Sequence, residues 1–180
     1  MAKQNKMIPT DGQYLGSVVS EIRELLNKSR QNVAIQVNQE LLSTYWHIGE
    51  IIVRYEQNEQ VRAAYGDATL RQLSKALTKE LGKGFSQSNV YNMRLFYLTH
   101  PIFQTVSGKL SWSHYCELIS VSDPDKRSFY EQECIKSSWS VRELRRQKES
   151  MLFERLLLSR GDVNKTQVLS LAQKGIEYTK

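Results

Sequence analysis

The sequence predicts an all-α fold, a helical bundle with long N-terminal helices and a helix-turn-helix-like unit. Apolar residues recur at three- and four-residue spacing over most of the chain. Only 3 prolines and 9 glycines occur among the 180 residues, and they fall between the periodic segments. No pair of alternating strand patterns survives comparison with the helical pattern. We therefore expect helices throughout.

The first two periodic segments lie near the N-terminus. Residues 15–26 place apolar side chains on one helical face, and residues 34–55 continue the pattern for about six turns, with a break expected at residues 28–32. An apolar helical face of this length needs a similarly long partner to cover it. The two helices can cover each other within one bundle, or a second copy can cover them in a homodimer, and both alternatives stay open.

Signals for helix ends predict the next element. A polar loop at residues 58–67 ends at Asp67, a good N-cap, and leucines at three- and four-residue spacing then mark a helix as far as residue 81. Gly82 stops this helix, and Lys83-Gly84 forms a tight turn.

Four later helices begin with capping residues. Ser86 opens a helix of about three turns, and Ser111 opens a short one. Asp123-Pro124 combines a cap with a first-turn proline. Ser140 begins a capping box whose helix is expected to run to about residue 158.

Composition limits the class of protein. A content of 40% hydrophobic and 24% charged residues is typical of a folded domain. We expect a flexible N-terminus at 1–13, a helical domain at 14–160 and a linker-like segment at 161–180. No apolar stretch approaches the roughly 18 residues of a membrane span, and no secretory signal is recognisable, so a cytoplasmic location without membrane contact is expected.

Enzyme and metal signals are weak. Two cysteines with no Cys/His cluster around them do not predict a zinc site, and no metal or cofactor is expected. The three histidines are not accompanied by a nucleophile elbow, an H-E-x-x-H motif or a P-loop. We therefore predict no catalytic residue.

The helix at 67–81, the glycine turn and the helix at 86–98 have the spacing of a helix-turn-helix, whose second helix enters the DNA major groove. With the apolar residues of the second helix packed inward, amide, hydroxyl and guanidinium groups project outward to read base edges. Residues 70–100 hold five basic residues and one acid, which suits phosphate contacts. Two amphipathic helices with solvated outer faces would show the same pattern. The predicted DNA contacts here are Lys75, Lys79, Lys83, Gln87, Ser88, Asn89, Tyr91, Asn92 and Arg94.

A second basic cluster lies on the helix that Ser140 opens. Arg142, Arg145 and Arg146 fall within two turns and are predicted as a phosphate clamp on DNA. The alternative is a surface helix with local ion pairs, which contribute only a few tenths of a kcal/mol each.

Four stretches occur in the order found in a known family. They are residues 42–49 (Leu-Ser-Thr-Tyr-Trp-His-Ile-Gly), 85–97 (containing Ser-Asn-Val-Tyr-Asn-Met-Arg-Leu-Phe-Tyr), 110–114 and 139–144 (Trp-Ser-Val-Arg-Glu-Leu). Together they resemble the N-terminal domain of the YhcG-like bacterial proteins, over about residues 14–160. The resemblance implies a helical, helix-turn-helix-like DNA-binding module that usually precedes a predicted nuclease domain of the PD-(D/E)xK type. The carboxylates and lysine of that nuclease core have no counterparts here.

The predicted function is DNA binding, with duplex DNA as partner, as the targeting or regulatory module of a bacterial nuclease system. The alternative is a protein-interaction or oligomerisation module, in which the long helix with Tyr45, Trp46 and Tyr55 binds a partner helix or a nuclease subunit. Added salt distinguishes the two functions, because it weakens the affinity for DNA phosphates but preserves binding through an apolar interface.

Overall fold

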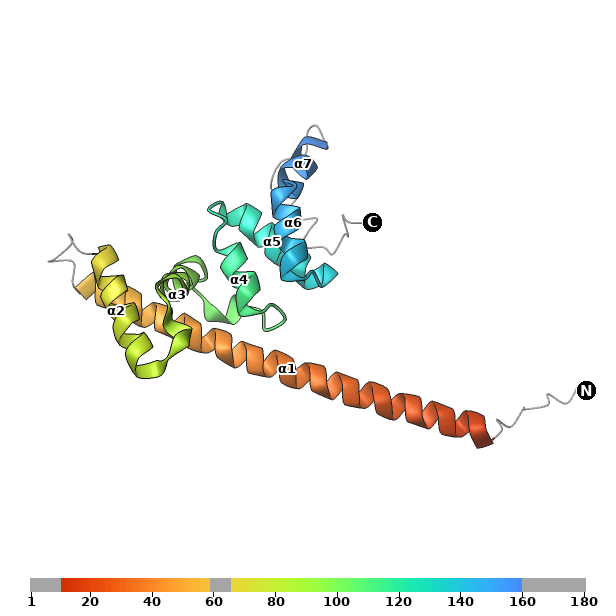
Figure 1. The fold of residues 1–180 in the computed structure, drawn as a ribbon. Helices are drawn as coiled ribbons and strands as arrows, with labels where there is room; N and C mark the ends of the chain where they lie inside the picture. Colours follow the sequence, from red (N-terminus) through yellow and green to blue (C-terminus); the bar gives the residue numbers. More distant parts are fainter. Residues whose placement is uncertain (1–10, 59–65, 160–180) are drawn as a thin grey trace, which may run out of the picture. The chain divides into compact units, whose positions relative to one another are not determined.

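The chain is mainly helical over the residues that the computed structural model describes, 11–58 and 66–159, with turns and short irregular segments between the helices (Figure 1). Within these ranges no strand occurs, so the all-α prediction is confirmed. The predicted terminal segments 1–13 and 161–180 lie outside the described residues, except that residues 11–13 belong to the first helix. None of the described helices is both long and apolar enough to cross a membrane. The helices are α1 (Asp11–Asn58), α2 (Gly66–Leu81), α3 (Gln87–Thr99), α4 (Trp112–Leu118), α5 (Pro124–Ser137), α6 (Val141–Glu149) and α7 (Leu152–Ser159), with short 3-10 turns η2 (Lys83–Phe85) and η3 (Phe103–Thr105).

Helix α1 is continuous through residues 28–32, so the break expected there is absent. The physical reason is that this stretch holds Ser29 and Asn32 but neither glycine nor proline, and serine and asparagine cost a helix only a few tenths of a kcal/mol each. The loop expected at 58–67 lies largely outside the described residues. Since α2 already begins at Gly66, Asp67 falls within its first turn and does not precede the helix.

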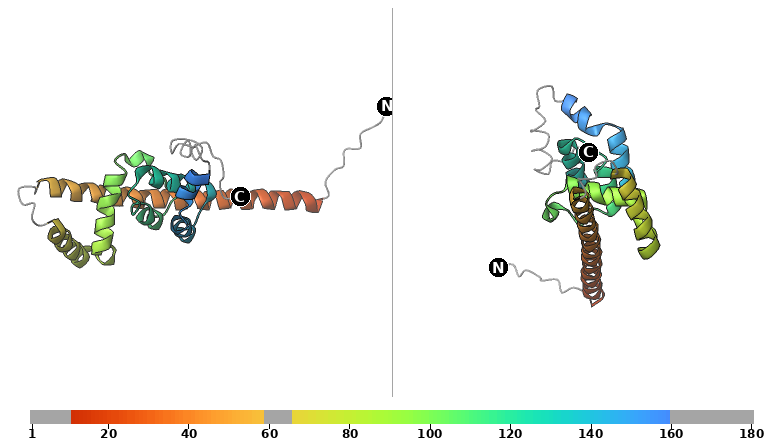
Figure 2. Two further views of the ribbon diagram at one scale, coloured as in Figure 1. Left: turned by 90° about the horizontal axis from the view of Figure 1, so that it is seen from above. Right: turned by 90° about the vertical axis from the view of Figure 1, so that its left-hand side faces the viewer.

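The chain divides into two compact units, Met1–Val37 and Asn38–Lys180. The described part of the first unit is helical. The second unit contains the main core, whose largest fully buried side chains include Phe96, Tyr115 and Tyr130. Figure 2 shows from two further directions that this unit is built from helices and their connections.

Three predicted N-caps are confirmed. The Ser86 side chain accepts a hydrogen bond from the backbone N–H of Asn89, and Ser140 accepts one from that of Glu143. Asp123 caps α5 by accepting from two backbone N–H groups, with proline at the next position. Because side-chain caps satisfy donors that each helix leaves unpaired, these helix starts could be read from local sequence.

The single helix expected from Ser140 to about residue 158 is interrupted, so that prediction is wrong. Met151 adopts a left-handed conformation with φ of 54° between α6 and α7. The turn redirects the chain so that Leu152 and Phe153 are buried in the core, where the Phe153 ring lies 5.3 Å from that of Phe129. Burial of two large apolar side chains outweighs the local cost of about 1–2 kcal/mol for a left-handed residue.

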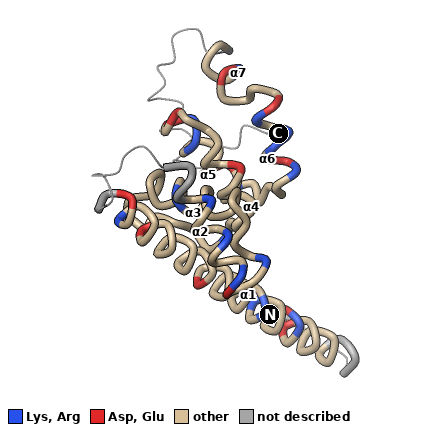
Figure 3. The backbone as a smooth tube through the Cα atoms, turned by 60° about the vertical axis from the view of Figure 1, so that its left-hand side comes forward, with Lys and Arg blue, Asp and Glu red and all other residues tan. Residues whose placement is uncertain are grey.

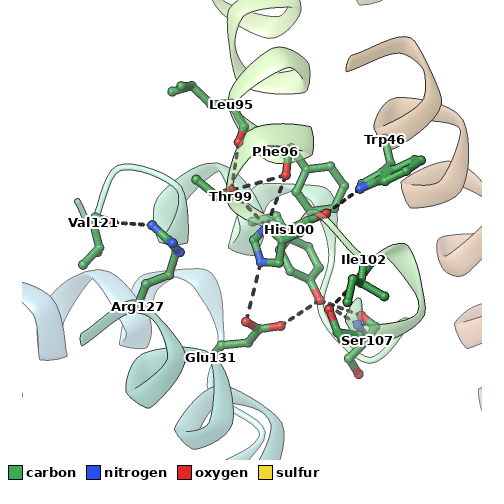
Figure 4. A network of polar contacts seen from close by, with 12 residues as sticks. Trp46, Leu95, Phe96, Thr99, His100, Ile102, Ser107, Val121, Arg127 and Glu131 are labelled. Carbon is green, nitrogen blue, oxygen red and sulfur yellow. Dashed lines mark hydrogen bonds and ion pairs between the residues drawn. The ribbon is translucent and has the colours of Figure 1, made fainter. Parts of the chain in front are cut away.

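A buried polar network ties the segment after α3 to the core (Figure 4). Trp46 Nε1 donates to the carbonyl oxygen of His100 at 2.7 Å, and the His100 Nε2 lies 3.6 Å from a Glu131 carboxylate oxygen. The Tyr115 hydroxyl accepts from the Ser107 N–H at 2.8 Å and donates to Glu131 at 3.3 Å. Burial and the nearby carboxylate raise the pKa of Tyr115, which therefore stays protonated. The network fixes the path of residues 100–107.

Candidate nucleic-acid interface

Helices α2 and α3 are joined by a turn whose conformation is fixed from both sides. Gly82 has a φ of 93°, and its N–H donates to the carbonyl of Thr78 at 3.1 Å, which ends α2. The hydroxyls of Ser74 and Thr78 both donate to the carbonyl oxygen of Phe85, at 2.7 and 3.0 Å. These two hydroxyls of α2 thus bind the carbonyl oxygen of Phe85 in the turn, and they help to fix the angle between α2 and α3.

A small apolar cluster holds this pair of helices on the C-terminal part of α1. Its buried members are Ile52 from α1, Leu70 from α2 and Val90 from α3, and Phe85 packs against them from the turn. Each helix therefore contributes one fully or nearly fully buried aliphatic side chain. The pairing of α2 with α3 around a glycine turn has the connectivity that the sequence predicted for these residues.

The outer side of α2 carries a basic stripe. Arg71, Lys75 and Lys79 are exposed and follow each other at four-residue spacing, which places them on one side of the helix, and exposed Lys83 follows in the turn. Among the described residues, none of these four forms an ion pair with an acid. Figure 3 marks the lysine and arginine positions of the described chain in blue along the backbone. Arg71 was not among the predicted contact residues, although its spacing to Lys75 could have indicated it. We call these four residues the basic stripe.

Helix α3 presents three predicted contact residues to solvent. Gln87 and Ser88 in its first turn are exposed, and Tyr91 one turn later is 45% exposed. Asn92 is half-buried, and its amide nitrogen lies 3.5 Å from the sulfur of Cys116. The exposed polar side chains are thus concentrated at the N-terminal end of the helix, where a groove-reading helix makes its base contacts.

Two predicted contact residues are instead engaged within the protein. The Asn89 amide donates to the carbonyl of Gly84 at 2.6 Å and accepts from the Trp112 indole N–H at 2.8 Å. The Arg94 Nε donates to Glu56 Oε2 at 2.6 Å, and both side chains are less than one-third exposed. The sequence predicted that Arg94 projects outward, because helical spacing does not show that Glu56 of α1 lies beside it. Asn89 and Arg94 hold α3 in place.

The three arginines of α6 lie in different environments. Arg145 is paired with Glu117 of α4 at 2.5 Å, and Arg146 with Glu143 at 2.7 Å. Arg142 is exposed and has no ion-pair partner within the described part of the chain. Burial acts to raise the pKa of Glu117, but hydrogen bonds from Arg145 and Lys148 outweigh it and lower that pKa.

The aromatic residues of α1 that could bind a partner are mostly occupied. The Tyr45 ring lies 4.7 Å from that of Trp112, and the Trp46 ring lies 4.8 Å from that of Tyr97. Among the three predicted residues Tyr45, Trp46 and Tyr55, only Tyr55 is half exposed. Tyr45 and Trp46 therefore belong to the packing of the second unit.

The first unit has an exposed apolar stripe along α1. Its side chains repeat at three- and four-residue spacing on one helical face, and each is at least 47% exposed. We call it the α1 stripe: Leu15, Val19, Ile22, Leu26, Val33 and Val37. Exposed apolar rows of this length commonly mark an interaction surface.

No group of three or more histidine, cysteine, aspartate or glutamate side chains that could hold a metal ion is present within the described ranges. Both cysteines are free thiols. Within the described residues, the candidate interface is therefore the basic and polar surface of α2, the turn and α3.

The chain matches the model of one protein family. The DUF1016 N-terminal domain covers residues 21–155, which is most of the chain, and the protein belongs to this family. It is also 37% identical over 170 residues to a protein of Escherichia coli (strain K12) named "Putative nuclease YhcG". The alignment covers 77% of this chain and 45% of that relative, so the chain spans less than half of the relative's length. No solved structure matches.

Proposed function

We propose that this chain is a DNA-binding module that acts with a nuclease activity, and that it binds duplex DNA through α2, the glycine turn and α3. The proposal rests on four basic side chains on α2 and the turn that have no ion-pair partner among the described residues, combined with exposed amide, hydroxyl and phenol groups on α3. Cations that are not neutralised by the protein are available to phosphates, and neutral polar groups are available to bases.

The electrostatic setting supports the same function. The whole chain has a formal charge of +6, and the basic stripe has no acidic partner among the described residues. By contrast, Arg145 and Arg146 are neutralised locally, so Arg142 is the one arginine of α6 without an ion-pair partner in the described structure. We therefore assign the main phosphate contacts to the basic stripe and only an accessory contact to Arg142.

The relation to a protein named as a nuclease supports nucleic acid as the ligand class. In our proposal the described residues supply recognition, and the cleavage chemistry belongs to a nuclease domain or subunit that acts with them.

The test is fluorescence anisotropy of a labelled duplex at about 50 and 200 mM salt, where counterion release predicts a steep loss of affinity. If about five phosphates are neutralised, log affinity falls against log salt with a slope of about −4 to −5. Replacing Lys75 and Lys79 by alanine is expected to reduce that slope by about two. Lys109, which is exposed but lies outside the unit, provides the matched control, Lys109→Ala. A duplex affinity that does not change with salt contradicts the proposal.

A second function is supported by a separate observation, the α1 stripe. We propose that a second copy of the chain covers it in a homodimer, because six exposed apolar side chains on one face bury well against an identical helix. Sedimentation analysis should show a dimer that persists in high salt, and Ile22→Glu together with Leu26→Glu should convert it to a monomer. A wild-type protein that is monomeric at all concentrations tested contradicts this second proposal.

A further inference from the structure

The first turns of α3 border a hollow of about 410 Å³. Leu70 of α2 lines it from one side, and Gln87, Ser88, Tyr91 and Asn92 of α3 line it from the other. The hollow is therefore formed by the same polar residues that the sequence predicted as DNA contacts, with the addition of an aliphatic wall. A convex recognition helix that only reads groove edges has no need of such a concavity.

The lining indicates the chemistry of the ligand. It combines one half-exposed aromatic ring, one hydroxyl, two primary amides and one leucine, and no charged residue is among the described side chains that line it. A neutral planar heterocycle with donors and acceptors on its edge matches this set, because its face can stack on Tyr91 and its edge can pair with amides. With about 410 Å³, the hollow lies toward the small end of the range of about 300–1,000 Å³ found for ligand pockets, which suits one heterocyclic base.

The surroundings place phosphate near such a base. Arg71 directly follows Leu70 in α2 and projects from the helix about 100° away from it, so the basic stripe runs along the side of α2 next to the one that lines the hollow, at four-residue spacing. Sites for unpaired nucleotides combine an aromatic stacking platform with a cationic path for the backbone. Both parts are present here on neighbouring residues of one unit.

We infer that the hollow binds a single unstacked base of otherwise duplex DNA, with the face of the base against Tyr91 and its edge toward Gln87 and Asn92. A base inside an intact duplex offers only its edge, because its faces are covered by the neighbouring pairs, and it cannot stack on Tyr91. This inference rests on the proposed DNA-binding function and narrows its ligand class to DNA with an unpaired base, such as a bulge or a frayed end.

The experiment compares two labelled duplexes of identical sequence with the full chain at low salt, one fully paired and one with a single bulged 2-aminopurine. Wild-type protein is expected to bind the bulged duplex about tenfold more tightly, in line with the usual contribution of one base–aromatic stack. In Tyr91→Leu this preference is expected to disappear, and the fluorescence of the bound 2-aminopurine should rise because the quenching ring is gone.

Tyr55→Leu is the matched control, since Tyr55 is 50% exposed and lies outside the hollow. It should keep the tenfold preference, and thermal unfolding of both variants should match the wild type. Equal affinity of wild type for the two duplexes overturns the inference and leaves the DNA-binding proposal standing. A bulge preference that survives in Tyr91→Leu also overturns it. Absence of binding to either duplex at low salt overturns the DNA-binding proposal itself.

Discussion

Gly49 of α1 lies directly against the backbone of Met93 in α3. A β-carbon added at Gly49 would approach the Met93 carbonyl oxygen to 2.2 Å and the Tyr97 β-carbon to 2.9 Å. The absence of a side chain at this position therefore lets α3 pack closely on α1. This contact sets the position of the helix that carries the candidate DNA-binding residues.

We expect Gly49→Ala to destabilise the protein by about 2 kcal/mol or more, because the obstructing atoms are backbone and cannot rotate away. Urea unfolding followed by circular dichroism measures the change. Gly84→Ala is the control, since a β-carbon there would have no neighbour within 4 Å. Equal stability of both variants would contradict the close-packing account.

Gly82 is predicted to be sensitive for a different reason, its backbone conformation. With a φ of 93° and open space around it, alanine meets no steric neighbour but adopts a conformation that L-residues disfavour by about 1–2 kcal/mol. Gly82→Ala should therefore lower the unfolding free energy by about 1–3 kcal/mol, and Gly82→Asn by a similar amount, because a ψ of −161° places this residue outside the left-handed helical region that asparagine tolerates. If alanine and asparagine are equally harmless, the turn is not held in this conformation.

Gln87 and Asn89 are both predicted DNA contacts, but their replacement should affect stability and DNA binding in opposite ways. Asn89→Ala removes the acceptor of the Trp112 indole and the donor to Gly84, and should cost about 1–2 kcal/mol of stability. Gln87→Ala, at an exposed position, should change stability by less than about 0.5 kcal/mol while weakening duplex binding. Parallel thermal unfolding and anisotropy titrations separate the two effects. A stable Asn89→Ala variant would place Asn89 among the free contact residues.

Stability should fall in acid because carboxylates, among them Glu117 and Glu154, are stabilised in their charged form. Burial acts to raise the pKa of Glu117 and of Glu154, yet hydrogen bonds from Arg145 and Lys148 to the first, and from Lys126 to the second, lower both values below the ordinary range. A lowered native pKa adds stability above the unfolded-state pKa of about 4.5, and this is lost as the pH falls through the native value. Unfolding free energies measured from about pH 6 to pH 3 should show this decline.

The control for this pH effect is Glu117→Gln, which replaces the titrating carboxylate of Glu117 by a neutral amide. Its stability should be lower at neutral pH, and it should decline less steeply in acid than that of the wild type. An unchanged pH dependence in this variant would mean that the ion pairs of Glu117 do not contribute.

Cys134 should be inert in the folded protein. Burial raises the pKa of its thiol to about 12, so almost no thiolate, the reactive form, exists near neutral pH. Burial also raises the pKa of Cys116. Alkylation at about pH 8 followed by mass spectrometry should modify Cys134 only after denaturant is added. Rapid alkylation of the native protein would contradict the burial of this residue.

The amino-acid sequence by itself determined the features that depend on neighbours in the chain. Ser86, Asp123 and Ser140 start helices because each side chain bonds to backbone N–H groups two or three residues later, and Gly82 ends one because only glycine adopts its conformation easily. The all-α fold and the pairing of α2 with α3 follow from such local signals, together with the spacing of apolar residues.

Tertiary structure alone decided which of the candidate side chains are available to a ligand. Arg94 pairs with Glu56, 38 positions earlier, and Asn89 binds Trp112, 23 positions later, and no helical spacing relates either pair. The interruption at Met151 likewise depends on burial of Phe153 against Phe129, which local sequence does not record. Local hydrogen bonds and periodicity are encoded within a few residues, whereas the partner of a long polar side chain depends on which helices pack together.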